Sequence, residues 1–300
     1  MRHYRSFFWP VVLILAGVVA LLVNAGVVSS DRLSLLVDLW PLILIVIGLE
    51  LIARRGLQGG AGDVAAVLIV LVAAGGALAY IALAPNPNAS HKLDTSADVG
   101  ALDHASLHVD AGAATITVTA SSVIAGDLYR AHIEYSGSRP EVNLDRSNGT
   151  LRISQGSAPF LQSRRFTLDL KINSSLPWAI ATDSGAATNT FNLANAHISS
   201  IEINTGASRE DITLGRPAGT VPITINGGSL TVRLHRPAGT AASVRVSGGA
   251  VSLDADGEPH RGIGSQTWSS AGAGSATDSY RVEVNGGACN VTIDATGTTA

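Results

Sequence analysis

The sequence predicts a membrane α plus all-β protein, in which three transmembrane helices precede a glycine-turn β-solenoid-like domain of about 21 residues per coil. Long apolar runs fill the segment 1–84, which carries only nine charged side chains. Short alternating segments broken by glycine turns fill the remainder. Four turn glycines follow one another at a constant interval of 21: Gly185, Gly206, Gly227 and Gly248.

The apolar runs at residues 7–28, 33–53 and 64–84 are each long enough to cross a hydrocarbon core of about 30 Å. Arginines precede the first run and follow the second, whereas only Arg32 lies between them. Because cytoplasmic loops carry an excess of Lys and Arg, we expect the N-terminus and the 54–63 loop in the cytoplasm. Three crossings then predict a multi-pass protein of the cell membrane with its β-domain outside the cytoplasm.

A cleaved signal peptide is the alternative for the first run. Its basic start, its apolar core and the small-residue pattern Val23-Asn24-Ala25 favour that interpretation. The length of the run and its echo in the second run favour a pair of spans instead.

Trp-Pro occurs near the start of the first two runs, as Trp9-Pro10 and again as Trp40-Pro41. Tryptophan prefers the membrane–water interface, and proline is tolerated in the first turn of a helix. The four residues are therefore predicted interface anchors in contact with the lipid bilayer, one pair at each face of the membrane.

Small residues inside the runs predict close helix packing, because glycine lets two helices approach each other. The predicted packing residues are Gly17, Gly48, Gly75 and Gly76. The alternative for both features is generic membrane anchoring without a specific helix partner.

Beyond the apolar runs, a linker is expected at 85–100 and the extracytoplasmic β-domain at 101–300. The alternating apolar residues of one unit should stack on those of the next, so that Val244 and Val251 lie on Ile223 and Leu230. Cys289 takes the same place in the last unit and is predicted to be a buried core residue. Residues that fit the period poorly, 119–180, should pair as longer strands at one end.

The period is interrupted within residues 257–281, because the next turn glycine, Gly286, follows Gly248 by well over one period. Insertions in repeat proteins form surface loops, and Trp268 in such a loop could anchor a partner. The alternative is a connector whose Trp268 folds back onto the sheet.

Charge and motifs exclude several classes of function. Residues 85–300 carry 15 Lys and Arg against 19 Asp and Glu, so no basic surface for nucleic acid is expected. A single cysteine excludes an intrachain disulfide. The histidines show no metal-site spacing, and neither a nucleophile elbow nor a phosphate-binding loop is present. We therefore predict no enzyme, no catalytic residue, no metal and no cofactor.

The segments "WPVVLILAG" and "LWPLILIVIGLELIARR" resemble the LiaI/LiaF-like transmembrane region of bacterial envelope-stress proteins. The repeats "LPWAIATDSGAATNTFNL", "IEINTGAS" and "INGGSLTVRL" resemble the toast-rack or adhesin-head β-domains found with it. The resemblance implies a regulator of cell-envelope stress, since LiaF restrains a membrane histidine kinase. The chain differs from LiaF, which has four spans and a cytoplasmic C-terminal domain.

The sequence thus predicts a non-enzymatic membrane protein that senses or modulates envelope stress through its β-domain and through helix contacts. Its predicted partners are the bilayer and a membrane sensor kinase or another envelope protein, with the oligomeric state left open. The alternative is a structural or adhesive surface module on a passive anchor.

Overall fold

The computed structural model describes residues 90–124, 126–156 and 165–296, together with Val72 and Gly76. The strands belong to one compact unit, residues 90–158 and 164–300. Across these described residues, no helix combines the length and the hydropathy needed to cross a bilayer. The predicted spans 7–28, 33–53 and 64–84 lie outside the described part, apart from Val72 and Gly76.

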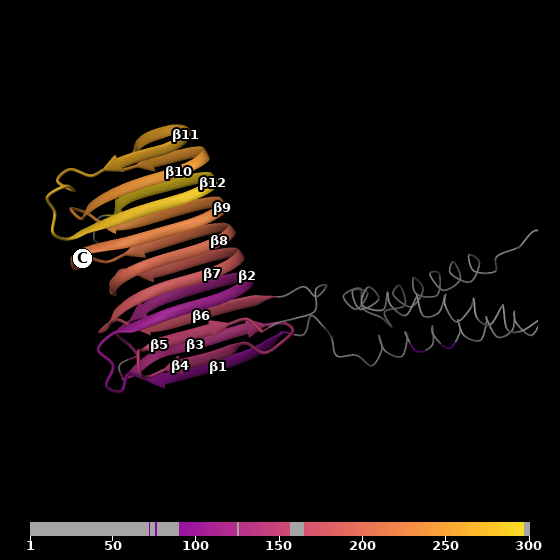
Figure 1. Cartoon of the computed structure of the whole chain (residues 1–300). Coiled ribbons are helices and arrows are strands. Elements are labelled where there is room, and N and C mark those ends of the chain that lie inside the picture. The colour runs from indigo at the N-terminus through magenta and orange to yellow at the C-terminus, as the bar shows by residue number, and fades with distance from the viewer. Residues whose placement is uncertain (1–71, 73–75, 77–89, 125, 157–164, 297–300) are drawn as a thin grey trace, which may run out of the picture. The chain divides into compact units, whose positions relative to one another are not determined.

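The described chain forms a single sheet of twelve strands (Figure 1). Ten of them follow one another in the order β1-β3-β6-β2-β7-β8-β9-β12-β10-β11, while β5 pairs with β2 and β4 pairs with β5. The strands are β1 (His91–Asp98), β2 (Ala105–Ser121), β3 (Asp127–Tyr135), β4 (Glu141–Asp145), β5 (Thr150–Ser154), β6 (Phe166–Asn173), β7 (Pro177–Leu193), β8 (His197–Leu214), β9 (Thr220–Pro237), β10 (Ala241–Ala255), β11 (Glu258–Ser269) and β12 (Ser279–Thr296). The prediction of a mostly β domain is confirmed.

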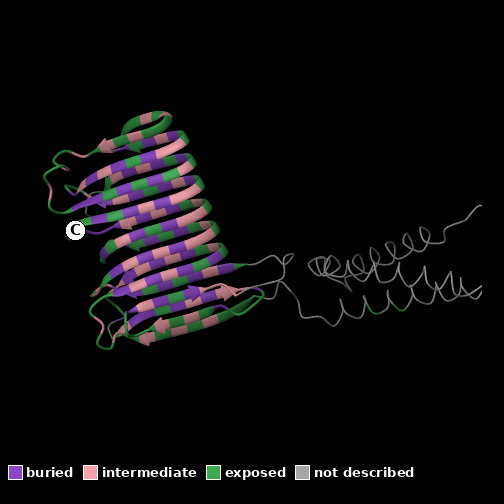
Figure 2. Cartoon of the chain, in the orientation of Figure 1, coloured by how far each residue is buried: buried purple, intermediate pink, exposed green. Residues whose placement is uncertain are grey.

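Each long strand has two arms that face the same core. In β9, the buried residues before Gly227 have odd numbers and those after Gly228 have even numbers. Successive side chains of a strand point to opposite faces, so this change of phase requires the chain to turn at the two glycines. Both arms contribute to one apolar cluster, and Figures 1 and 2 show the long strands curving at one end. The buried residues of β9 are Val221, Ile223, Ile225, Leu230, Val232 and Leu234.

Stacked glycines make this turn tight. A Cβ added to Gly206 would lie 2.5 Å from the carbonyl oxygen of Gly185, and one added to Gly228 would lie 2.7 Å from that of Gly206. Contacts this short exclude any side chain, which explains the glycine in each repeat. The row across the sheet is Gly112, Gly185, Gly206, Gly228, Gly287 and Gly249. The predicted 21 residues per coil does not hold from β8 to β9, because Gly228 and not Gly227 stacks on Gly206 and the register offset is 22 (Ala207 opposite Ser229).

A ladder of amide side chains lies directly before the turn. The Asn204 side chain donates to Asp183 Oδ1 at 3.0 Å, Asn226 donates to Asn204 Oδ1 at 2.9 Å, and Asn285 donates to Asn226 Oδ1 at 3.1 Å. These residues are aligned by the parallel register of β7, β8, β9 and β12. The recurring Asn-Gly and Asn-Thr-Gly of the sequence therefore supplies one hydrogen-bond partner per strand.

The order of the last strands differs from the expected one. β12 lies between β9 and β10 and is parallel to both. Val244 and Val251 therefore do not lie on β9 as predicted, because Val282 and Cys289 occupy those places. The alternating pattern is the same in β10 and β12, so it cannot decide which of them adjoins β9. The predicted burial of Cys289 is confirmed: it is 4% exposed, between Leu230 and Val251 in the register.

The other end of the sheet is antiparallel. β1 pairs with β3, and β3 with β6, so the second half of the expected 85–100 linker is an edge strand of the β-domain. Residues 119–180 do contribute strands at this end, but β3 to β6 are only 5 to 9 residues long, so the expectation of longer strands is wrong. Lys92, Asp94 and Asp98 place charges on β1, and charges on an edge strand discourage unwanted strand addition.

Candidate functional site

Most of the predicted site residues lie outside the part of the chain that the structure describes. This applies to the interface anchors Trp9, Pro10, Trp40 and Pro41 and to the packing residues Gly17, Gly48 and Gly75. Gly76 is described as an exposed helical residue. Trp268 is the predicted residue whose surroundings can be followed in full, and it lies in β11 at the edge of the sheet.

The predicted surface loop over 257–281 is in its first half a strand. β11 runs antiparallel to β10, with Trp268 opposite Val244. Asp256 and Gly257, at φ 50° and 83°, form the tight turn that reverses the chain. The residues between β11 and β12, 270–278, remain as the connector. Ser, Thr and Gly are frequent in this strand, so its composition resembles that of a loop.

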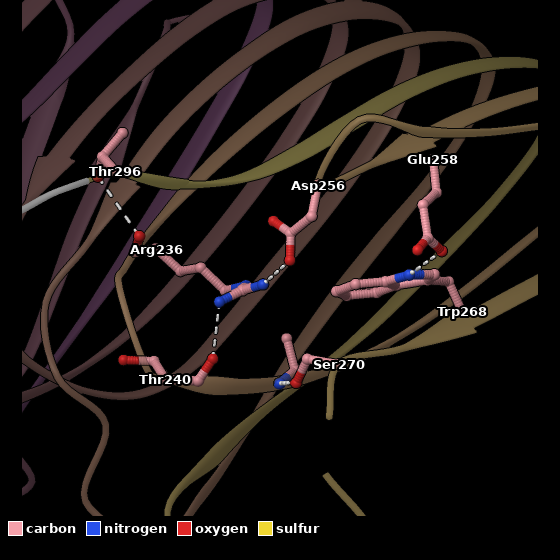
Figure 3. A network of polar contacts seen from close by, with 8 residues as sticks. Arg236, Thr240, Asp256, Glu258, Trp268, Ser270 and Thr296 are labelled. Atoms are coloured by element: carbon pink, nitrogen blue, oxygen red, sulfur yellow. Dashed lines mark hydrogen bonds and ion pairs between the residues drawn. The ribbon is translucent and has the colours of Figure 1, made fainter. Parts of the chain in front are cut away.

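Trp268 folds back onto the sheet and packs against the buried core, as the alternative interpretation predicted. Its indole N–H donates to Glu258 Oε2 at 3.2 Å (Figure 3). The Arg236 guanidinium carbon lies 5.7 Å from the centroid of the indole, within range of a cation–π interaction. Trp268, near the end of β11, thus contacts both the start of β11 at Glu258 and the end of β9 at Arg236.

Arg236 is the centre of this network and is only 3% exposed. Its Nη1 donates to the Thr240 carbonyl at 2.8 Å, and its Nη2 forms an ion pair with Asp256 (Figure 3). A buried cation is costly unless it is paired and hydrogen-bonded, and both conditions hold for these two nitrogens. The network therefore fixes the β10–β11 turn against β9, which is a structural task rather than a catalytic one.

Trp268 is therefore expected to stabilise the β11 edge locally. Trp268→Ala should lower the free energy of unfolding by about 1 kcal/mol, through lost packing and a lost cation–π contact. Amide hydrogen exchange should accelerate in 258–269 and stay unchanged in β7 and β8. Ile263→Ala is the matched control on the same strand, because Ile263 is 86% exposed. Equal exchange in the two variants would contradict the assignment.

A second polar region crosses β1, β3 and β6. An open groove of about 420 Å³ is lined by Asp94, Thr95, Ser96, Arg130, Ala131, His132, Asp169 and Lys171. His132 Nδ1 lies 2.5 Å from Asp94 Oδ1, and Lys92 pairs with Glu134 at 2.9 Å. The Asp94 carboxylate raises the pKa of His132, and the Lys92 ammonium lowers the pKa of Glu134. No sequence pattern indicates this groove, because its charges come from three segments far apart in the chain.

No group of three or more His, Cys, Asp or Glu side chains within the described ranges is arranged to hold a metal ion. His235, like His132, lies between two carboxylates. Its Nδ1 lies 2.7 Å from Asp294 and its Nε2 lies 3.6 Å from Asp211. These are polar contacts between β8, β9 and β12 on the outer face of the sheet.

Two protein families match the chain. Residues 85–235 match the family described as the N-terminal domain of toast_rack, DUF2154. Residues 7–52 match the LiaI-LiaF-like transmembrane region, which covers the first two predicted spans. No curated protein matches the chain.

The solved structures that match are adhesin-like. A candidate cell adhesion protein from Clostridium sporogenes is 16% identical, with a TM-score of 0.59 over 69% of this chain and 100% of its own. A candidate adhesin from Bacteroides fragilis is 11% identical, with a TM-score of 0.26 over 69% of this chain and 97% of its own. The first likeness supports the β-fold, and at this identity it supports the fold alone.

Proposed function

We propose, from the premise that this chain belongs to the toast-rack family and begins with a LiaI-LiaF-like transmembrane region, that it is a regulator of cell-envelope stress. In this proposal the β-domain lies outside the cytoplasm and binds a partner or ligand, and the three spans transmit the binding event. The protein acts by association and not by catalysis.

The observation that carries the proposal is the presence of both families in one chain, at residues 7–52 and 85–235. A β-domain that served only for display would need no particular membrane region. The arginine pattern supports an external β-domain, since Arg2 and Arg5 precede the first run while Arg54 and Arg55 follow the second. The parallel register of β7, β8 and β9 supports a solenoid-like stack, which offers an extended binding surface.

Helix contacts are the proposed route of transmission. Gly17, Gly48, Gly75 and Gly76 would let the spans approach each other and a membrane partner such as a sensor kinase. Trp9-Pro10 and Trp40-Pro41 would fix the depth of the first two spans. The LiaF arrangement, with four spans and a cytoplasmic C-terminal domain, would instead put the β-domain on the side of the kinase's catalytic region.

Leucine substitutions test the transmission. Leucine at Gly17 and Gly48 should abolish co-purification with the membrane partner and the stress response. The matched control carries leucine at Val19 and Val46, which lie about 200° around an ideal helix from the two glycines. An unchanged response in the glycine variant would contradict the proposal.

Reporters active on one side of the membrane, fused after the β-domain, test its location, and a cytoplasmic signal would overturn the three-span topology.

An adhesive surface module on a passive anchor is the second candidate. The likeness to the Clostridium sporogenes protein, which is described as a candidate cell adhesion protein, favours it. Replacing the segment 1–84 by an unrelated three-span anchor separates the two functions. An adhesin keeps its function after this exchange, whereas a regulator loses it.

A further inference from the structure

Two polar side chains interrupt an apolar row inside the core. Each long strand contributes one inward-facing residue to this row, which consists of Ile116, Asn189, Glu210, Val232, Val291 and Leu253 in the order of the strands. Asn189 on β7 and Glu210 on β8 are both 0% exposed. Burial of an ionised carboxylate without a counter-charge is among the costliest events in folding, so this pair needs an explanation.

Asn189 and Glu210 are joined by one hydrogen bond, and each keeps one polar atom without a partner. Asn189 Nδ2 donates to Glu210 Oε1 at 3.0 Å. The two atoms left over, Asn189 Oδ1 and Glu210 Oε2, are buried and have no hydrogen-bond partner, and the Ser208 hydroxyl two residues before Glu210 is likewise buried without one. An amide oxygen only accepts hydrogen bonds, and the same is true of an ionised carboxylate. A neutral carboxylic acid carries one O–H donor, which is what the amide oxygen lacks.

We propose that Glu210 is protonated in the folded domain and donates its O–H to Asn189 Oδ1, so that the two side chains form a cyclic pair of hydrogen bonds in the core. The pair then leaves neither atom unsatisfied and buries no charge. Opening of the β7–β8 region in water at neutral pH releases the proton. The β-domain is thus a proton-binding module whose closed form is favoured by acid.

The surroundings of Glu210 contain no cation to replace the proton. Its register neighbours are Asn189 on β7 and Val232 on β9, and the flanking Arg209 and Asp211 face the opposite side of β8. Among the described residues, Arg236 is the other buried charged side chain; it lies at the end of β9 and is paired with Asp256 in the β10–β11 turn. The buried titratable groups that remain are neutral: the Tyr280 hydroxyl donates to the Gly215 carbonyl, and Cys289 lies two strands away from β8.

Burial raises the pKa of Glu210, and the nearby Ser208 hydroxyl and the Asn189 amide offset part of that rise. The unfolded chain loses this proton near pH 4.5, the usual value, whereas the folded domain keeps it to higher pH. The stabilisation from the pair is therefore complete below pH 4.5 and is lost as the pH rises through the folded value. Within that window the unfolding equilibrium constant grows about tenfold per pH unit.

Infrared spectroscopy of the full-length protein, in a detergent that has no carbonyl group, tests the protonation directly. At about pH 6, where exposed carboxyl groups are ionised, the wild type should show the C=O stretch of a protonated carboxylic acid. Glu210→Gln should abolish it, because a glutamine can form both hydrogen bonds without a titratable proton. Glu202→Gln is the matched control on the same strand, since Glu202 is exposed, and it should leave the band intact.

Stability against pH gives the second readout. The pH dependence of proteolytic cleavage within β7 and β8 should become flatter in Glu210→Gln and stay unchanged in Glu202→Gln. If Glu210→Gln does not fold, Asn189→Ile combined with Glu210→Val restores the apolar row. This double variant should also lack the infrared band and show the flatter pH dependence of cleavage. Absence of the band in the wild type, or an unchanged slope in a folded Glu210 variant, would overturn the proposal and indicate an ionised carboxylate held by a trapped ion or water.

Discussion

Trp178→Ala is expected to lower the free energy of unfolding of the β-domain by about 4 kcal/mol, since the loss of a fully buried aromatic side chain leaves a cavity. Trp178 is 0% exposed, and its indole N–H donates to the Asn173 carbonyl at 2.8 Å. The Asn173 side chain in turn donates to the Asp127 carbonyl at 2.8 Å. Trp178 thus joins the antiparallel strands at one end to the parallel stack. Denaturant titration of the purified protein, followed by proteolytic protection of β6 and β7, measures the loss.

Trp268→Ala is the natural control for this experiment. Both variants remove an indole that donates one hydrogen bond, but Trp268 is only partly buried at the β11 edge. Only the Trp178 variant should expose β3 and β6 to protease. A smaller loss for Trp178→Ala than for Trp268→Ala would mean that the core does not depend on the indole of β7.

Gly206→Ala is expected to cost about 3 kcal/mol, because overpacking at a fixed backbone forces neighbouring strands apart. The new Cβ would lie 2.5 Å from the Gly185 carbonyl oxygen, which belongs to the backbone and cannot rotate away. Proteolysis at the turn of β7 and β8, together with the midpoint of denaturant unfolding, reports the change. Gly274→Ala is the matched control, since its Cβ would meet no atom within 4 Å. Equal unfolding midpoints for the two variants would show that the stacked turns can move apart without a loss of stability.

The sequence predicts what depends on local pattern. The alternation around each turn glycine predicts the two-armed strands of β8 and β9, and it places Cys289 in the core between Leu230 and Val251. Periodicity carries this information because the side chains of a strand alternate between two faces. Strand order depends on more than pattern. Since β10 and β12 have equivalent apolar residues, the local sequence pattern does not determine which of them pairs with β9.

The edge strands escape prediction for a related reason. β1 and β11 each have one neighbour among the described strands, so half of their backbone and most of their side chains face water. Their composition is accordingly polar and resembles that of a linker or loop. The buried pair of Asn189 and Glu210 also escapes prediction, because each residue alone has the composition of a solvated strand face. Alternation places them on the inward face with Phe191 and Ile212, but only the register shows that the two side chains meet.

The position of β12 has a consequence for how the domain is made. The ribosome delivers β10 and β11 before β12, yet β12 must come to lie between β9 and β10. While residues 279–296 are still missing, the apolar arms of β10 match the open edge of β9 equally well. Premature docking there would give a competing misfolded form that has to reopen before the last strand can enter. The strand order therefore requires this end of the sheet to assemble last, and it stays exposed to proteases and chaperones until then.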